Sequence, residues 1–194
     1  MVWISNGDSG SSVRTKLNTI PNDGTSFLGL QRLDRATPSG TAVVTFSSIV
    51  QTYDHLHIKL FGASTASATF ASVLLTFNND TSSIYDQSIA KFNGTSSLSN
   101  SAANASIKAF DIPGATAAAN AGGSGVIDIP GYAINAAALQ KSTTSQGAWK
   151  NSTSDMSVFG NAGWWRSGVP ITRIDLTLSN GNWVAGSLVC LYGY

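Results

Sequence analysis

The sequence predicts an all-β protein, a β-sandwich with a short helical arm at its N-terminus. From residue 41 onward, short segments rich in β-branched and aromatic residues alternate with turn residues. Residues 53–61 alternate apolar and polar side chains, as expected for a strand that packs on one side. No helical pattern of any length follows residue 40. These three observations favour two packed sheets over an α/β fold.

Length and composition indicate one domain preceded by an arm. With 194 residues, 42% of them apolar, the chain is long enough for one sizeable core. We assign residues 1–40 to the arm and residues 41–194 to the sandwich. In the arm, Val13, Leu17 and Ile20 recur at helical spacing, and Pro21 ends the pattern. Such a short helix is marginal alone, so its apolar stripe is expected to serve assembly or anchoring.

The strand candidates of the sandwich are short and bounded by turn residues. They are residues 42–46, 53–61, 69–77, 106–112, 126–134, 157–165, 171–178 and 183–192. Between the last two, Asn180-Gly181 is a strong signal for a tight turn between paired strands. The sequence therefore predicts that the chain ends in an antiparallel hairpin.

Two uncharged stretches, residues 92–105 and 113–125, consist mostly of Ser, Ala, Asn and Gly. One interpretation is that they are flexible loops. The other is that they become ordered by packing against neighbouring subunits, because solvated loops usually keep some charge. The sequence does not decide between the two.

The charge balance argues against nucleic acid as a partner. Only 11% of the residues are charged, and the 11 basic and 10 acidic residues leave a net charge of +1. They form no basic patch that could release counterions from a phosphate backbone.

No apolar run approaches the length of a membrane span, and the N-terminus lacks the basic region of a signal peptide. We therefore expect a soluble protein, without membrane insertion or secretion signal.

Catalytic and metal-binding patterns are weak, and we expect neither an enzyme nor a cofactor. Residues 7–10 resemble the serine motif of trypsin-like proteases, but both histidines follow it. His55 and His57 share a strand face without a third ligand to complete a metal site. The aspartates are scattered singly, and Cys190 lies in an apolar run typical of the core.

Trp164 and Trp165 are the best candidates for a recognition surface. Neighbouring residues on a strand point to opposite faces, so one of the two indoles can remain exposed. Exposed tryptophan stacks on sugars and anchors interfaces. The alternative places one indole in the core and the other under a loop or a neighbouring subunit.

Three segments are distinctive when taken together: residues 6–18, the strand-turn-strand segment 46–58, and the ending 179–193. They resemble segments of virion structural and tail-fibre proteins of tailed bacteriophages, especially those of aquatic bacteria. Val50 departs from the pattern, in which proline more often follows the isoleucine. The resemblance leaves the middle of the chain unmatched. It implies a homotrimeric particle component without a cofactor, and it favours a jelly roll over an immunoglobulin-like sandwich, which strand count alone does not separate.

The function implied by this resemblance is structural. We expect a subunit on the virion surface, either a capsid decoration (cement protein or head fibre) or a short fibre, assembled in the cytoplasm of the bacterial host. Its partners would be further copies of itself and either the major capsid protein or a tail or baseplate component. The alternative is a tail-tip module that binds host surface glycan through Trp164 and Trp165. A polysaccharide-degrading enzyme is a third hypothesis, with no catalytic constellation to support it.

Overall fold

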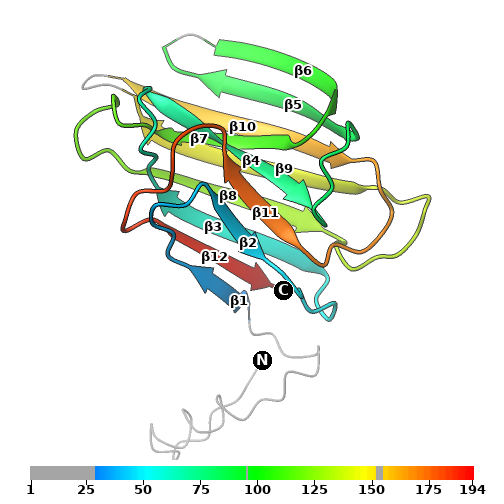
Figure 1. Ribbon diagram of the computed structural model, residues 1–194. Coiled ribbons are helices and arrows are strands. Elements are labelled where there is room, and N and C mark those ends of the chain that lie inside the picture. The colour runs from blue at the N-terminus through cyan, green and yellow to red at the C-terminus, as the bar shows by residue number, and fades with distance from the viewer. Residues whose placement is uncertain (1–28, 95, 152–154) are drawn as a thin grey trace, which may run out of the picture.

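The computed structural model describes residues 29–94, 96–151 and 155–194, which form two antiparallel sheets packed face to face (Figure 1). These residues contain no helix. The all-β prediction and the β-sandwich architecture are therefore confirmed. The eight-stranded sheet has the order β1 (Gln31–Ala36), β12 (Leu188–Gly193), β3 (His55–Gly62), β8 (Gly123–Pro130), β9 (Lys141–Lys150), β10 (Met156–Trp165), β5 (Tyr85–Phe92) and β6 (Ser96–Asn104). The four-stranded sheet has the order β2 (Val43–Phe46), β11 (Ile174–Leu178), β4 (Phe70–Phe77) and β7 (Ile107–Pro113).

Strand pairing is nested along the chain. β1 pairs with β12, β2 with β11, β3 with β8 and β4 with β7, all antiparallel. The remaining strands are two consecutive pairs, β5 with β6 and β9 with β10. Both pairs follow β8 in the strand order, so they add strands only to the larger sheet. In Figure 1, β6 and β1 therefore lie at opposite edges of that sheet.

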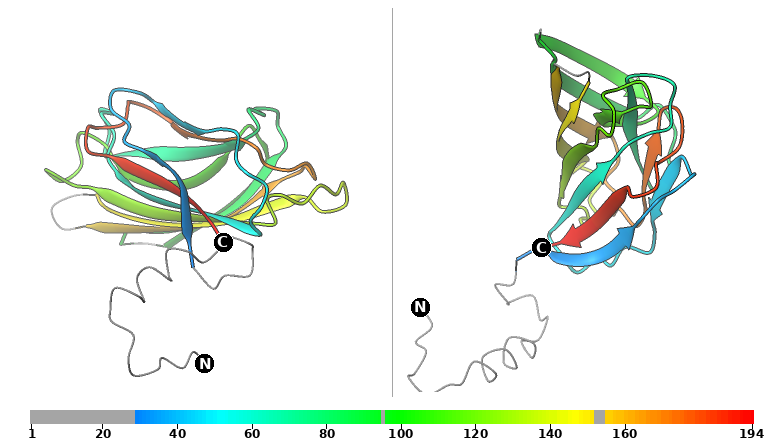
Figure 2. Two further views of the ribbon diagram at one scale, coloured as in Figure 1. Left: turned by 90° about the horizontal axis from the view of Figure 1, so that it is seen from below. Right: turned by 90° about the vertical axis from the view of Figure 1, so that its left-hand side faces the viewer.

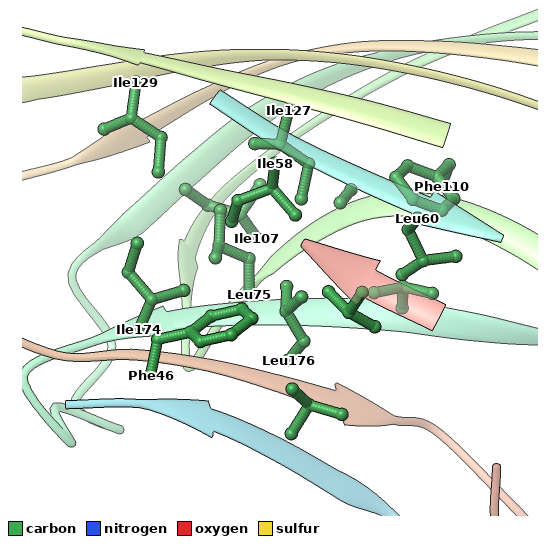
Figure 3. Packing of buried hydrophobic residues seen from close by; sticks show 14 of the residues in the cluster. Phe46, Ile58, Leu60, Leu75, Ile107, Phe110, Ile127, Ile129, Ile174 and Leu176 are labelled. Atoms are coloured by element: carbon green, nitrogen blue, oxygen red, sulfur yellow. The ribbon is translucent and has the colours of Figure 1, made fainter. Parts of the chain in front are cut away.

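The core lies between the two sheets and follows from strand alternation. Leu56, Ile58 and Leu60 of β3 point inward, while His57 and Lys59 between them point out, as predicted. Figure 3 shows such side chains meeting Phe46, Leu75 and others from the smaller sheet. Burying this much apolar surface is the main favourable term in folding.

Glycines in the larger sheet make room for one large ring. Phe110 of β7 packs where Gly125 and Gly147 carry no side chain. A Cβ at Gly125 would lie 2.2 Å from Phe110 Cζ, and one at Gly147 would lie 2.7 Å from Phe110 Cβ. The two glycines therefore permit a close approach between β7 and the strands β8 and β9.

The predicted terminal hairpin is wrong. β11 and β12 lie in different sheets, and neither pairs with the other. The turn signal itself is real, because Gly181 has a φ of +67°. After the turn, Trp183 is fully buried and bridges Ser64, so the chain crosses the sandwich instead of doubling back.

Residues 96–104, within the first uncharged stretch, form strand β6, so the flexible-loop interpretation is wrong for them. In the second stretch, β8 begins at Gly123 after a series of turns.

The strands β5 and β9 were not predicted at all. Strand β1 lies inside residues 1–40, so the larger sheet takes in part of the segment assigned to the arm. The helix expected around Val13, Leu17 and Ile20 lies outside the described residues.

Candidate functional site

One face of the eight-stranded sheet packs on the smaller sheet, and we call the opposite face the outer face. Figure 2 shows the two sheets from the side, with the smaller one against the inner face only. No other element of the described ranges covers the outer face. A wide sheet face without a covering layer is the natural place for contacts with a ligand or another molecule.

Trp165 belongs to the core. It is 2% exposed and lies between the rings of Phe77 and Tyr85, with centroid distances of 5.4 Å and 6.3 Å. Its Nε1 donates a hydrogen bond to Asp80 Oδ2 at 3.3 Å. Burial raises the pKa of the Tyr85 phenol to about 12. Tyr85 therefore stays neutral at ordinary pH, and Trp165 has no surface to offer a ligand.

Trp164 lies on the outer face and is 43% exposed. Its Nε1 donates a 2.5 Å hydrogen bond to Gln140 Oε1, which fixes the orientation of the indole. The ring borders an open depression of about 590 Å³ across β9, β10, β5 and β6. The lining residues are Asp86, Gln87, Asn100, Ser101, Ala102, Ser142, Thr143, Thr144, Ala162, Gly163 and Trp164.

The depression combines an aromatic face with neutral polar groups. Hydroxyls of Ser142 and Thr144 and the amide of Asn100 can exchange hydrogen bonds with a hydroxyl-rich ligand. Asp86 is the one carboxylate among the described lining residues, and it already accepts from the Ala103 amide at 2.9 Å and lies 3.4 Å from Arg166 Nε. Glycoside hydrolysis in its usual form uses two carboxylates, and the described lining residues supply one.

A second feature of the outer face is an apolar corner, formed by Phe92, Leu98, Met156 and Val158. All four side chains are at least half exposed, and Leu98 reaches 81%. Val158 stands directly opposite Phe92, and Leu98 follows Ser96, the partner of Phe92, by two residues on the same face. The corner was missed from sequence, because β6 consists of Ser, Ala and Asn apart from Leu98 and has little β-propensity.

A buried ion cluster fixes β5 against the smaller sheet. The fully buried carboxylate of Asp111 contacts Lys91 Nζ at 3.2 Å and Lys108 Nζ at 2.9 Å and accepts from Ser72 Oγ at 2.7 Å. The Lys91 ammonium lies 4.3 Å from the Phe70 ring centroid. Paired charges and cation–π contacts together offset the cost of removing these groups from water.

The two histidines of β3 have different neighbours. His57 Nδ1 lies 2.5 Å from Asp128 Oδ1, whereas the His55 ring packs at 5.1 Å from that of Tyr194. No group of three or more His, Cys, Asp or Glu residues comes together within the part of the chain that is described. Cys190 is buried, as predicted. The serine motif at residues 7–10 lies outside the described residues.

The strands and the open face together define the protein as a β-sandwich whose larger sheet has a wide uncovered outer face. Comparison with family models, curated proteins and solved structures finds no match. None of the described residues forms a helix long and apolar enough to cross a membrane.

Proposed function

We propose that the chain is a non-enzymatic structural subunit of an assembled particle, and the sequence resemblance favours the surface of a tailed-phage virion. The outer face carries this proposal. It carries the apolar corner and has no covering element among the described residues. Exposed apolar groups gathered on one face are typical of surfaces that meet another protein.

The strand order supports a jelly roll as the finer description of the fold. Without the two added strand pairs, each sheet has four strands, β1-β12-β3-β8 facing β2-β11-β4-β7. The nested antiparallel pairs are those of a long hairpin rolled into two sheets, the arrangement of an eight-stranded jelly roll. On this view, the β5–β6 and β9–β10 pairs are insertions that build most of the candidate site.

The proposal includes two further points, which are the position of the chain on the particle and its assembly as a homotrimer. The partners would be other copies and either the major capsid protein or a tail or baseplate component, with Val13, Leu17 and Ile20 as the anchoring stripe. Immunogold labelling of purified particles tests the proposal with an antibody against residues 41–194. We expect labelled particles from the wild type and none after deletion of the gene. The proposal would be contradicted if wild-type particles stayed unlabelled both when intact and after unfolding, which would expose a hidden epitope.

A second candidate function is the binding of host surface glycan at the Trp164 depression. Its support is the immobilised, half-exposed indole beside hydroxyl and amide side chains. Saturable binding to purified host polysaccharide would be measured by calorimetry. We expect Trp164→Ala to abolish binding while thermal unfolding stays unchanged. Val158→Ala, an exposed apolar truncation outside the depression, is the matched control. Equal binding by Trp164→Ala and the wild type would remove this site.

A further inference from the structure

The four edge strands of the sandwich differ in how well they are protected against pairing with another strand. An unprotected edge displays unpaired N–H and C=O groups, which invite a new strand. Edge β2 has only four residues, and β7 ends in Pro113 and carries the Lys108–Asp111 ion pair. Edge β1 has a register shift and contains the charged residues Arg32, Asp34 and Arg35. These three edges show the usual protective features.

Edge β6 shows almost none of them. It is nine residues long, has neither charge nor proline, and is exposed over all but its last residue. A bulge disturbs only its end, where Ala103 has a φ of +59° and donates to Asp86. From Ser96 to Ser101 the strand pairs with β5 in uninterrupted register. This six-residue run therefore presents a regular open edge.

We propose that β6 is a homotypic contact, at which two copies of the chain join their eight-stranded sheets by antiparallel pairing along residues 96–101. A second copy fits this edge because the run is neutral, so identical strands can face each other in any register without like-charge repulsion. The inference rests on the proposed structural role and names the contact by which copies join.

The apolar corner supports the choice of occupant. Leu98 projects from the open run itself, and Phe92 and Val158 follow on the two strands behind it. A two-fold axis perpendicular to the sheet would keep the outer face continuous and bring the two corners beside each other. Leu98 would then meet an uncharged residue of the same run in the second copy. Such an isologous contact is self-complementary and closed.

The contact is small, so we expect it to be weak in solution and to gain strength in an assembly. A six-residue strand pairing with one apolar corner buries less than the roughly 800 Å² per partner of a standard stable interface. Repetition within a particle raises the effective concentration of each further contact. Each chain has one β6 edge, so pairing through β6 joins single chains two by two and doubles the mass of a single chain.

Sedimentation of the full chain over a concentration series tests the contact. We expect reversible doubling of mass in the wild type, and loss of doubling in the variant Leu98→Lys/Asn100→Lys. The variant Leu98→Glu/Asn100→Glu should also fail alone, whereas an equimolar mixture of the two variants should pair again. Thr144→Lys/Gln146→Lys places the same charge on exposed residues of the central strand β9 and should leave doubling intact.

Hydrogen exchange identifies the surface involved. Amides of residues 96–101 should exchange more slowly at high wild-type concentration, and not in the lysine variant. Absence of doubling, doubling that survives the lysine substitutions, or doubling without slower exchange in β6 would each overturn the inference. Failure of the structural role is distinguishable, because the chain would then be missing from particles while the mass doubling and its charge rescue persist.

Discussion

Trp164 and Trp165 are adjacent in sequence, yet strand alternation gives them opposite environments. Trp165 fills the space between Phe77 and Tyr85, and Trp164 borders an open depression. Truncation of Trp165 would leave a cavity in a packed interior, whereas truncation of Trp164 removes a partly exposed ring. Strand alternation predicted that one indole points inward and the other outward, but it did not predict which of the two tryptophans is buried.

This difference predicts unequal effects on stability. We expect Trp165→Ala to lower the free energy of unfolding by about 3–5 kcal/mol, the usual cost of a buried aromatic truncation. Trp164→Ala should cost less than about 1 kcal/mol. Urea denaturation of both variants measures the two values. Equal losses would mean that the assignment of the inner and outer indole is wrong.

Asp175 predicts part of the acid sensitivity of the fold. Burial raises the pKa of this carboxyl, but hydrogen bonds from Arg173 and Thr45 outweigh it and hold the pKa below the ordinary 3.8. Arg173 donates two bonds to Asp175, both of 2.8 Å. A carboxyl with a lowered pKa in the folded state stabilises it above about pH 4, and this contribution is lost as pH falls through the folded pKa.

Asp175→Asn should therefore reduce stability at pH 6 and matter progressively less toward pH 3. Thermal unfolding across this range compares the variant with the wild type. Asp34→Asn, at an exposed position of β1, is the control and should give no such convergence. A constant difference between wild type and Asp175→Asn at all pH values would contradict this role.

At the scale of elements, β5 is held by internal charges as well as by apolar packing. Asp111 connects β7 to Lys91 of β5 within the sandwich. Removal of its charge would leave Lys91 and Lys108 close together without the anion that they share.

We expect Asp111→Asn to lower the free energy of unfolding by about 3–5 kcal/mol, the range found when one partner of a buried pair is removed. It should also speed hydrogen exchange in β5 and β6. Asp128→Asn makes the same change at a partly exposed carboxylate and should have little effect on either measurement. If β5 and β6 exchanged as slowly in Asp111→Asn as in the wild type, the cluster would not hold them.

Sequence patterns predicted the strands whose two faces differ strongly. β3 alternates core and surface residues, and β10 was predicted to within one residue at its start. β9, with the sequence KSTTSQGAWK, was not predicted, because three of its five inward positions are Thr143, Ser145 and Gly147. At Gly147 the facing Phe110 fills the space instead. β6 was not predicted because neither of its faces is buried, so its sequence lacks an apolar alternation.

Pairing between strands could not be predicted from local signals alone. The Asn180-Gly181 turn indicated a hairpin, but buried Trp183 and its bridge to Ser64 send the chain to the other sheet. That contact joins residues more than a hundred positions apart. The Trp164 depression likewise draws on four strands, so sequence could name the indole but not the groups around it.

At the scale of the whole molecule, the inner face of the eight-stranded sheet packs against the core, and its outer face remains open. The eight nested strands form the packed body, and the two inserted pairs enlarge the outer face and provide the β6 edge. The proposed structural role, the glycan site and the β6 contact all use that open surface.

The most direct test of the structural role is quantitative mass spectrometry of purified phage particles from a lysate that carries this gene. We expect the chain to be present in a fixed ratio to the major capsid protein. Hundreds of copies per particle would indicate decoration of the head, and a few to a few dozen would indicate a tail or portal appendage. Complete absence of the chain from the particles would contradict the account and reopen the hypothesis of an enzyme.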